Sequence, residues 1–193
     1  MADEPIGKER PVGKEERIGN IADDQLSDPQ RQAKAAFKAA RGIDVHGPFT
    51  VALHSPEVML GCAQLGRYLR YDSVLPPHLS ELAIMIVARQ WTQNFEWTHH
   101  YSHALKAGIG AAMLEQLRRH ERPDGMSIEQ AIVYDFSIEL QRTKGVSDDT
   151  YRRALEAFGK PGVVDLTGIN GYYAMLAMMM NVARTPTDET PLE

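Results

Sequence analysis

Apolar and polar residues alternate with a helical period along nearly the whole chain. Apolar positions recur every three or four residues, in segments that begin and end at helix-capping residues. The segment FTVAL, at 49–53, could form a strand but is too short to build a sheet. The pattern therefore predicts an all-α fold, a bundle of about seven to eight helices. The helices are expected at about 28–41, 56–71, 78–91, 95–107, 111–120, 128–143, 148–158 and 162–183.

The predicted helix at 78–91 carries apolar side chains on nearly every side, a pattern typical of a helix that is buried all round. Glu81 shares one of its faces with Ile84, Met85 and Ala88. Burial raises the pKa of a carboxyl group unless a cation pairs with it. We therefore expect Glu81 to have a partner on a neighbouring helix.

Composition and length indicate one domain. The chain has 193 residues, of which 43% are hydrophobic, which is enough to bury a core. Residues 1–25 are rich in charges of both signs, contain Pro5 and Pro11, and show no apolar periodicity, so we expect a flexible N-terminal arm. Residues 186–193 are expected to be a flexible tail, which leaves a single helical domain at 26–185.

Charge and hydropathy argue against several classes of protein. The net charge is -5 and no basic cluster occurs, so we expect no nucleic-acid partner. The longest apolar run, Tyr172 to Met180, is shorter than the roughly 18 to 20 residues of a membrane span. We expect a cytoplasmic protein with no membrane partner and no cofactor. Cys62 is the single cysteine, so one chain has no dithiol pair for redox chemistry.

Most of the candidate chemistry lies in the segment NFEWTHHYSH, at 94–103, which holds one carboxylate and three imidazoles. At about 100° per residue, Glu96, His99, His100 and His103 fall within an arc of roughly 100° on one face of the predicted helix. Trp97 points elsewhere. One helix therefore brings these four polar side chains within mutual reach.

Three interpretations of this stripe remain open at this point. The four residues could be an ordinary solvated face of a helix. They could bind a metal ion, since His99 and His103 are four residues apart and Glu96 lies one turn earlier, which gives two imidazoles and one carboxylate. They could also transfer protons, because a carboxyl group in apolar surroundings and a histidine of near-neutral pKa form an acid/base pair.

From about Pro48 to Arg184 the chain resembles the carboxymuconolactone decarboxylase and AhpD-like family. The resemblance rests on three segments in order, LSELAIMIVAR, then HH followed by ALKAG, then FGKPGVVDLTGINGYYAMLAMMMNVAR. It implies an AhpD-like helical bundle and a homo-oligomer, a trimer or a multiple of one.

The resemblance also implies where the site lies. Counting back from Gly108, the family's histidine falls on His100 and its glutamate on Glu81. The two cysteines of the peroxidase-reducing branch fall on Gln93 and Glu96, so both thiols are missing. Disulfide exchange needs an attacking thiolate and a resolving partner, and the chain is therefore not expected to be a thiol peroxidase.

Without the two thiols, the remaining glutamate and histidine residues are similar to the decarboxylase branch of the family. This similarity implies a lyase that acts on a small carboxylate or lactone, by decarboxylation or by proton transfer next to a carbonyl group. The expected catalytic residues are Glu81, Glu96, His100 and His103, with His100 as acid/base and Glu81 orienting its ring. Two carboxyl groups this close do not both ionise easily, so one raised pKa is expected between Glu81 and Glu96.

Two further expectations concern the substrate and the alternative function. Arg67, Arg70 and Arg89 are near enough in sequence to anchor a substrate carboxylate, and the sequence does not choose among them. The alternative is a non-catalytic or metal-binding oligomeric protein that keeps the same fold, with Glu96, His99 and His103 as the metal ligands.

Overall fold

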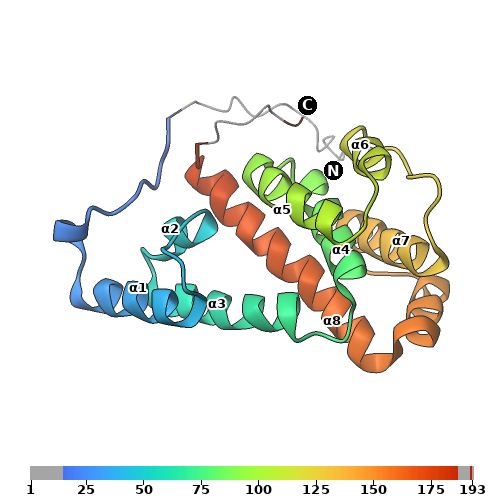
Figure 1. The fold of residues 1–193 in the computed structure, drawn as a ribbon, viewed down its shortest axis with the longest axis horizontal. Helices are drawn as coiled ribbons and strands as arrows, with labels where there is room; N and C mark the ends of the chain where they lie inside the picture. The colour runs from blue at the N-terminus through green and yellow to red at the C-terminus, as the bar shows by residue number, and fades with distance from the viewer. Residues whose placement is uncertain (1–14, 187–191, 193) are drawn as a thin grey trace, which may run out of the picture.

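The computed structural model describes residues 15–186 and 192, and within them the fold is all-helical (Figure 1). A short 3-10 turn at Asp23–Gln25 precedes eight α-helices. These are α1 (Asp28–Arg41), α2 (Pro48–Ala52), α3 (Pro56–Tyr71), α4 (Pro77–Gln90), α5 (Asn94–Lys106), α6 (Ala111–Arg118), α7 (Ile128–Thr143) and α8 (Asp148–Ala183). The predicted fold class is confirmed, and the predicted helix bounds agree to within two residues, with the last two predicted helices joined across a kink within α8.

One feature of the helices differs from the prediction, and one break in them agrees with it. Residues 49–53, considered as a short strand, lie almost entirely in helix α2, which starts at Pro48 directly after Gly47 at φ 55°. Five residues are too few to show a helical period. The helices expected at 148–158 and 162–183 together make up α8, and a kink at Gly159 (φ 65°, ψ 178°), followed by Pro161, separates them as predicted. Glycine adopts this backbone conformation without the steric cost that other residues meet.

Helix α4 is the centre of the molecule. Every residue from Leu79 to Arg89 is buried, as its all-round apolar pattern predicts. The helix packs against α5, α7 and α8, and more lightly against α6 and α3. A polar side chain on α4 is therefore held inside the bundle, which decides the surroundings of Glu81.

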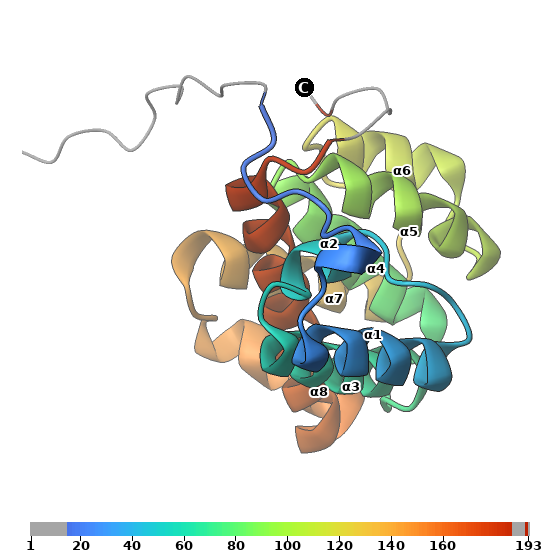
Figure 2. The same cartoon turned by 90° about the vertical axis from the view of Figure 1, so that its left-hand side faces the viewer.

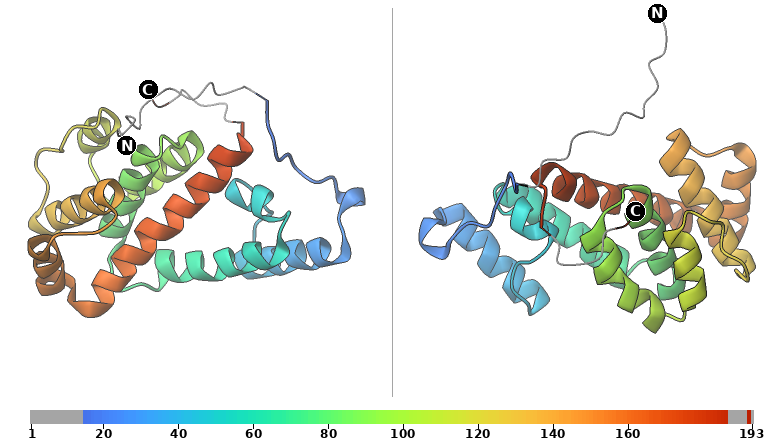
Figure 3. Two further views of the ribbon diagram at one scale, coloured as in Figure 1. Left: turned by 180° about the vertical axis from the view of Figure 1, so that it is seen from behind. Right: turned by 90° about the horizontal axis from the view of Figure 1, so that it is seen from above.

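Helix α8 divides the molecule. It runs diagonally across it, with α1, α2 and α3 on one side and α4 to α7 on the other, and the view from behind shows the same division (Figures 1 and 3). Helices α1 and α2 cover the side of the molecule that faces the viewer in Figure 2. Because α2 and α3 both contact α8, the first three helices form one wall of the space beside it.

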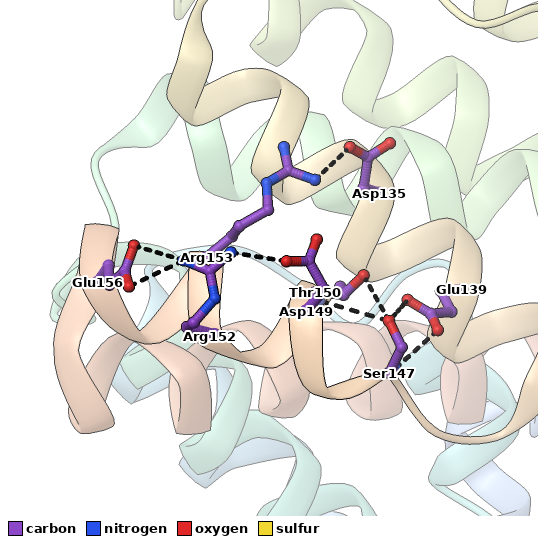
Figure 4. Close-up of polar contacts among 8 residues, drawn as sticks. All are labelled: Asp135, Glu139, Ser147, Asp149, Thr150, Arg152, Arg153 and Glu156. Carbon is purple, nitrogen blue, oxygen red and sulfur yellow. Dashed lines mark hydrogen bonds and ion pairs between the residues drawn. The ribbon is translucent and has the colours of Figure 1, made fainter.

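Polar contacts fix the connection between α7 and α8 (Figure 4). Ser147 is the N-cap of α8, and its hydroxyl accepts a hydrogen bond from the backbone N–H of Thr150 at 3.4 Å. Its own backbone N–H donates to Glu139 on α7 at 2.7 Å. Arg153 pairs with Asp135 at 3.0 Å, also across the two helices. Satisfied helix ends and cross-helix bonds of this kind hold α8 against α7.

The two ends of the chain are described only in part. Residues 1–14 of the predicted arm and residues 187–191 and 193 of the predicted tail lie outside the described residues. Further along the predicted arm, the backbone N–H of Arg17 donates to the carbonyl of Ala183 at 2.7 Å, and a ring nitrogen of His54 lies 2.8 Å from the carbonyl oxygen of Gly19. Near the other end, the N–H of Leu192 donates to the side chain of Asn94.

Element α8 spans 36 residues across the kink at Gly159, and it buries Asp165 and Asn170. Among residues 15–186 and 192, none of the helices combines the length and the apolar content that a membrane crossing requires.

Candidate functional site

The start of helix α5 sets the direction in which the polar stripe points. Gln93 is the N-cap, and its side-chain oxygen accepts hydrogen bonds from the backbone N–H groups of Phe95 at 2.7 Å and Glu96 at 3.4 Å. Its amide donates to Asn181 on α8 at 3.0 Å. Gln93, one of the two family cysteine positions, therefore has a structural role here: it caps α5 and ties it to α8.

The polar stripe of α5, formed by Glu96, His99, His100 and His103, faces the inside of the bundle. Glu96 and His100 are buried, His99 and His103 are partly exposed, and all four line one cavity of about 380 Å³. The cavity is bounded by α1, α2, α3, α5 and α8, so it lies where the first three helices meet the rest of the bundle. The interpretation of these residues as an ordinary solvated face does not hold for the two that are buried.

Glu81 and His100 form the hydrogen bond that the sequence led us to expect. Nδ1 of His100 lies 2.8 Å from Oε2 of Glu81, and the two side chains are 3% and 11% exposed. Burial acts to raise the pKa of Glu81, but the hydrogen bond from His100 and the charge of Arg70 outweigh it and lower that pKa below its usual value. Glu81 is therefore a carboxylate.

His100 is neutral in this pair. Burial lowers the pKa of its imidazole, and the bond to Glu81 only partly opposes that effect. Because the Glu81 carboxylate can only accept, the proton lies on Nδ1 of His100, which donates it to Glu81, and Nε2 carries the free lone pair. The ring of Tyr173 packs edge-on against that of His100, with centroids 5.1 Å apart at 89°, and holds its orientation.

Glu96 lies on the other side of the same imidazole. Its Oε2 is 3.6 Å from Nε2 of His100, too far for a hydrogen bond, and its Oε1 is buried with no partner in the described part of the chain. Burial raises the pKa of Glu96 to about 8, the charge of Arg70 opposes the shift, and the charge of Glu81 adds to it. Glu96 therefore holds a proton at neutral pH. One raised pKa was expected here, but burial, not carboxylate repulsion, is its main cause.

Arg70 is a cation that lies beside the Glu81 carboxylate. Its Nη2 lies 3.8 Å from Oε1 of Glu81, and its buried Nε has no hydrogen-bond partner among residues 15–186 and 192. Of the three arginines proposed as substrate anchors, Arg67 and Arg70 line the cavity. Arg89 lies elsewhere, with its Nε donating to the carbonyl of Arg118 at 2.6 Å.

His99 and His103 form the outer part of the stripe. His99 stacks on Phe95, with centroids 5.8 Å apart and planes 8° from parallel. Burial and the neighbouring positive charges lower the pKa of His99 to about 4, so it stays neutral. The ring of His103 is 5.7 Å from that of His100. His103 makes no hydrogen bond to the other predicted site residues in the described part of the chain, and burial lowers its pKa as well.

The set proposed as an alternative metal site was Glu96, His99 and His103. Within the described ranges, no three His, Cys, Asp or Glu side chains are arranged to hold a metal ion, and these three do not form such a group. The Glu96 carboxyl lies instead beside the ring of His100.

Arg41 and Tyr172 are among the residues of the cavity wall that sequence reasoning missed. Arg41 is the last residue of α1, where a basic side chain is common for reasons of helix stability alone. Tyr172 belongs to the apolar run of α8. Neither position carried a signal, because long-range packing brings them to the cavity.

Comparison of the chain with the models of known protein families and with curated proteins finds no match in either.

Proposed function

We propose that the protein is an acid/base enzyme that transfers a proton next to a carbonyl group of a small carboxylate or lactone, as a decarboxylase or isomerase similar to the carboxymuconolactone decarboxylases. The observation that carries this proposal is a buried row of three neighbouring side chains, Glu81, His100 and Glu96. His100 and Glu96 line a cavity of about 380 Å³. A cavity of that volume suits a small molecule.

The protonation states of the three groups support the chemistry. Glu81 is ionised and holds the His100 ring, His100 presents an unprotonated Nε2, and Glu96 carries a proton beside it, as the directions of their pKa shifts indicate. An unprotonated base and a protonated acid thus face the same cavity, which is the arrangement that general acid/base catalysis requires.

A decarboxylation would proceed as follows. The bond between the α carbon and the carboxyl carbon breaks, its electron pair moves into the enolate, and carbon dioxide leaves. Glu96 then gives its proton to the α carbon and regains one through His100 or solvent. In an isomerisation, Nε2 of His100 removes the α proton, the carbonyl oxygen takes the negative charge, and the proton returns to another carbon.

The arginines that line the cavity indicate which charge the substrate carries. Arg67 and Arg70 line the cavity, while Glu96 is neutral because burial raises its pKa, and Glu81 lies outside the lining residues. Arg70 pairs with Glu81 at 3.8 Å and Arg67 with Asp72 at 3.5 Å, but neither carboxylate is among the lining residues. The lining itself therefore carries positive charge, which favours an anionic substrate such as a carboxylate. Arg70 lies closest to the acid/base groups and is the proposed anchor.

The experiment is a screen of carboxylated lactones and β-keto acids for release of carbon dioxide, with metal content measured on the same preparation. The wild type is compared with Glu96→Gln, which keeps the shape of the neutral carboxyl group but cannot give a proton. His78→Ala, on α4 and outside the cavity lining, is the control. We expect turnover by the wild type and the control, and loss of about a hundredfold or more in Glu96→Gln. Equal turnover by all three proteins, or activity that follows a bound metal, would contradict the proposal.

A further inference from the structure

The hydroxyl group of Tyr172 is placed in a space that only a glycine leaves open. A Cβ atom at Gly66 on α3 would lie 2.2 Å from the hydroxyl oxygen of Tyr172 and 2.6 Å from Cζ. A tyrosine ring is stiff, so it could not move aside without shifting α8 or its own rotamer. Gly66 therefore allows the hydroxyl its position in the cavity wall.

The hydroxyl is available as a hydrogen-bond donor. Tyr172 is 4% exposed and lines the cavity, and its hydroxyl donates no hydrogen bond to another residue in the described part of the chain. Burial raises the pKa of Tyr172 well above its usual value, against the opposing effect of Arg41, so the group keeps its proton. The acid/base mechanism described above makes no use of it.

Arg41 interacts with Tyr172 and is positioned by further contacts of its own. Its Nη2 donates to the carbonyl of Ala63 at 2.8 Å, and its guanidinium lies over the rings of Phe37 and Phe49, 5.3 and 4.9 Å from their centroids. Among residues 15–186 and 192 it forms no ion pair with a carboxylate within 4.0 Å. A cation fixed by three contacts but not neutralised is prepared to bind an anion.

We propose that the Tyr172 hydroxyl and the Arg41 guanidinium form an oxyanion-binding subsite, which takes the negatively charged oxygen of an enolate or a similar planar oxyanion. The two groups come from α8 and α1, while the acid/base groups come from α4 and α5. Tyr173 connects the two parts, because its ring contacts those of both His100 and Tyr172, at centroid distances of 5.1 and 5.2 Å.

This subsite rests on the proposed function and adds a second catalytic element to it. When a proton or carbon dioxide leaves the α carbon, the electron pair moves toward the carbonyl oxygen, which becomes an oxyanion. A neutral hydroxyl donor and a fixed cation stabilise that charge without reorganising. Tyr172 and Arg41 are then catalytic residues, and Gly66 is a positioning residue that acts through Tyr172.

The test uses 4-nitrophenol as a probe, because its phenolate is a planar oxyanion whose absorbance differs from that of the neutral phenol. The probe is added to the full-length wild type below the pKa of the free phenol. We expect the wild type to bind the phenolate form and to raise its absorbance. Tyr172→Phe and Arg41→Gln should each weaken this binding by about tenfold to a hundredfold, the usual effect of losing a hydrogen bond to a charged group. Tyr71→Phe, in the same cavity, should not.

A second pair of variants tests the positioning. Gly66→Ala should weaken phenolate binding as Tyr172→Phe does, because the added Cβ displaces the hydroxyl. Gly61→Ala on the same helix has nothing within 4 Å of its added Cβ and should bind like the wild type. Circular dichroism on each variant confirms that the comparison is made between folded proteins.

The outcomes separate this inference from the proposed function. If the wild type binds only neutral phenol, or if Tyr172→Phe and Tyr71→Phe bind phenolate equally, the oxyanion subsite is wrong even where Glu96→Gln abolishes turnover. If phenolate binding depends on Tyr172 and Arg41 while Glu96→Gln keeps full turnover, the subsite stands and the acid/base assignment fails.

Discussion

Replacement of Glu96 by Gln should make the protein more stable at alkaline pH although it removes a group from the site. The carboxyl group has a pKa of about 8 in the folded protein, against an ordinary value of 4.5. A raised pKa in the folded state means that the stabilising contribution of the proton is fully present below 4.5 and is lost as the pH rises through 8. The free energy of unfolding should therefore fall with pH over this window.

The magnitude follows from the two pKa values. In the unfolded chain the Glu96 carboxyl group ionises at its ordinary pKa, but in the folded protein it keeps its proton up to about pH 8. Between about pH 5 and pH 9 this difference lowers the free energy of unfolding by about 4 kcal/mol. The amide introduced by Glu96→Gln resembles the neutral carboxyl group and does not titrate, so this dependence should disappear. The free energy of unfolding of Glu96→Gln, relative to that of the wild type, should thus increase by about 4 kcal/mol across the same range of pH.

The assay is urea unfolding, followed by circular dichroism, at several pH values across this range. The matched control is Glu57→Gln, which removes an exposed carboxylate on α3 outside the cavity lining and should leave the pH dependence as in the wild type. A wild type and a Glu96→Gln variant whose stabilities change in parallel with pH would refute the reasoning, because Glu96 would then be ionised or hydrated in the folded protein.

Four further predictions follow from the same site and surface. His100→Ala should lower the melting temperature, because it leaves the buried Glu81 carboxylate without its hydrogen-bond donor, a loss of several kcal/mol by order of magnitude; calorimetry that finds equal melting temperatures would contradict it. The protein should not reduce peroxiredoxin disulfides, and Cys62→Ser, which alters a buried thiol, should leave any lactone or keto-acid turnover intact in a coupled assay. Gly47→Ala should reduce turnover and stability together, since its Cβ would lie 2.4 Å from the Phe95 ring. Unchanged kinetics would contradict this prediction, because the loop before α2 would then have moved to accommodate the added Cβ. The protein should be a homo-oligomer, a trimer or a multiple of one, because large apolar side chains are exposed on its surface; light scattering that gives the mass of a monomer at micromolar concentration would end this prediction.

Much of the structure could be predicted from the helical period of the sequence. The period predicted the bounds of most helices, the burial of α4 all round, and the common face of Glu96, His99, His100 and His103 on α5. These are local properties, since about 3.6 residues per turn decide them whatever the chain folds against. The expected partner of Glu81 also followed, because a carboxylate inside an apolar helix needs a donor.

What could not be predicted depends on contacts between distant segments. The side of α5 that faces inward is set by Gln93, which bonds to Asn181 on α8, 88 residues away. Arg41 and Tyr172 meet only because α1 and α8 pack around α3, and Gly66 matters only through the hydroxyl beside it. The sequence predicted the acid/base residues as a stripe, but the cavity they face is a product of tertiary packing.

The measurement that tests the central claim most directly is the incorporation of solvent deuterium at the α carbon of a turned-over keto acid or lactone, followed by nuclear magnetic resonance in heavy water. The account predicts that the wild type and the His78→Ala control incorporate deuterium at the same rate. It predicts at least about a hundredfold slower incorporation when the group that transfers the proton is replaced, by Glu96→Gln for a decarboxylation or by His100→Ala for an isomerisation. Incorporation at the rate of the wild type by both Glu96→Gln and His100→Ala would contradict the account, because the proton would then be transferred by other groups.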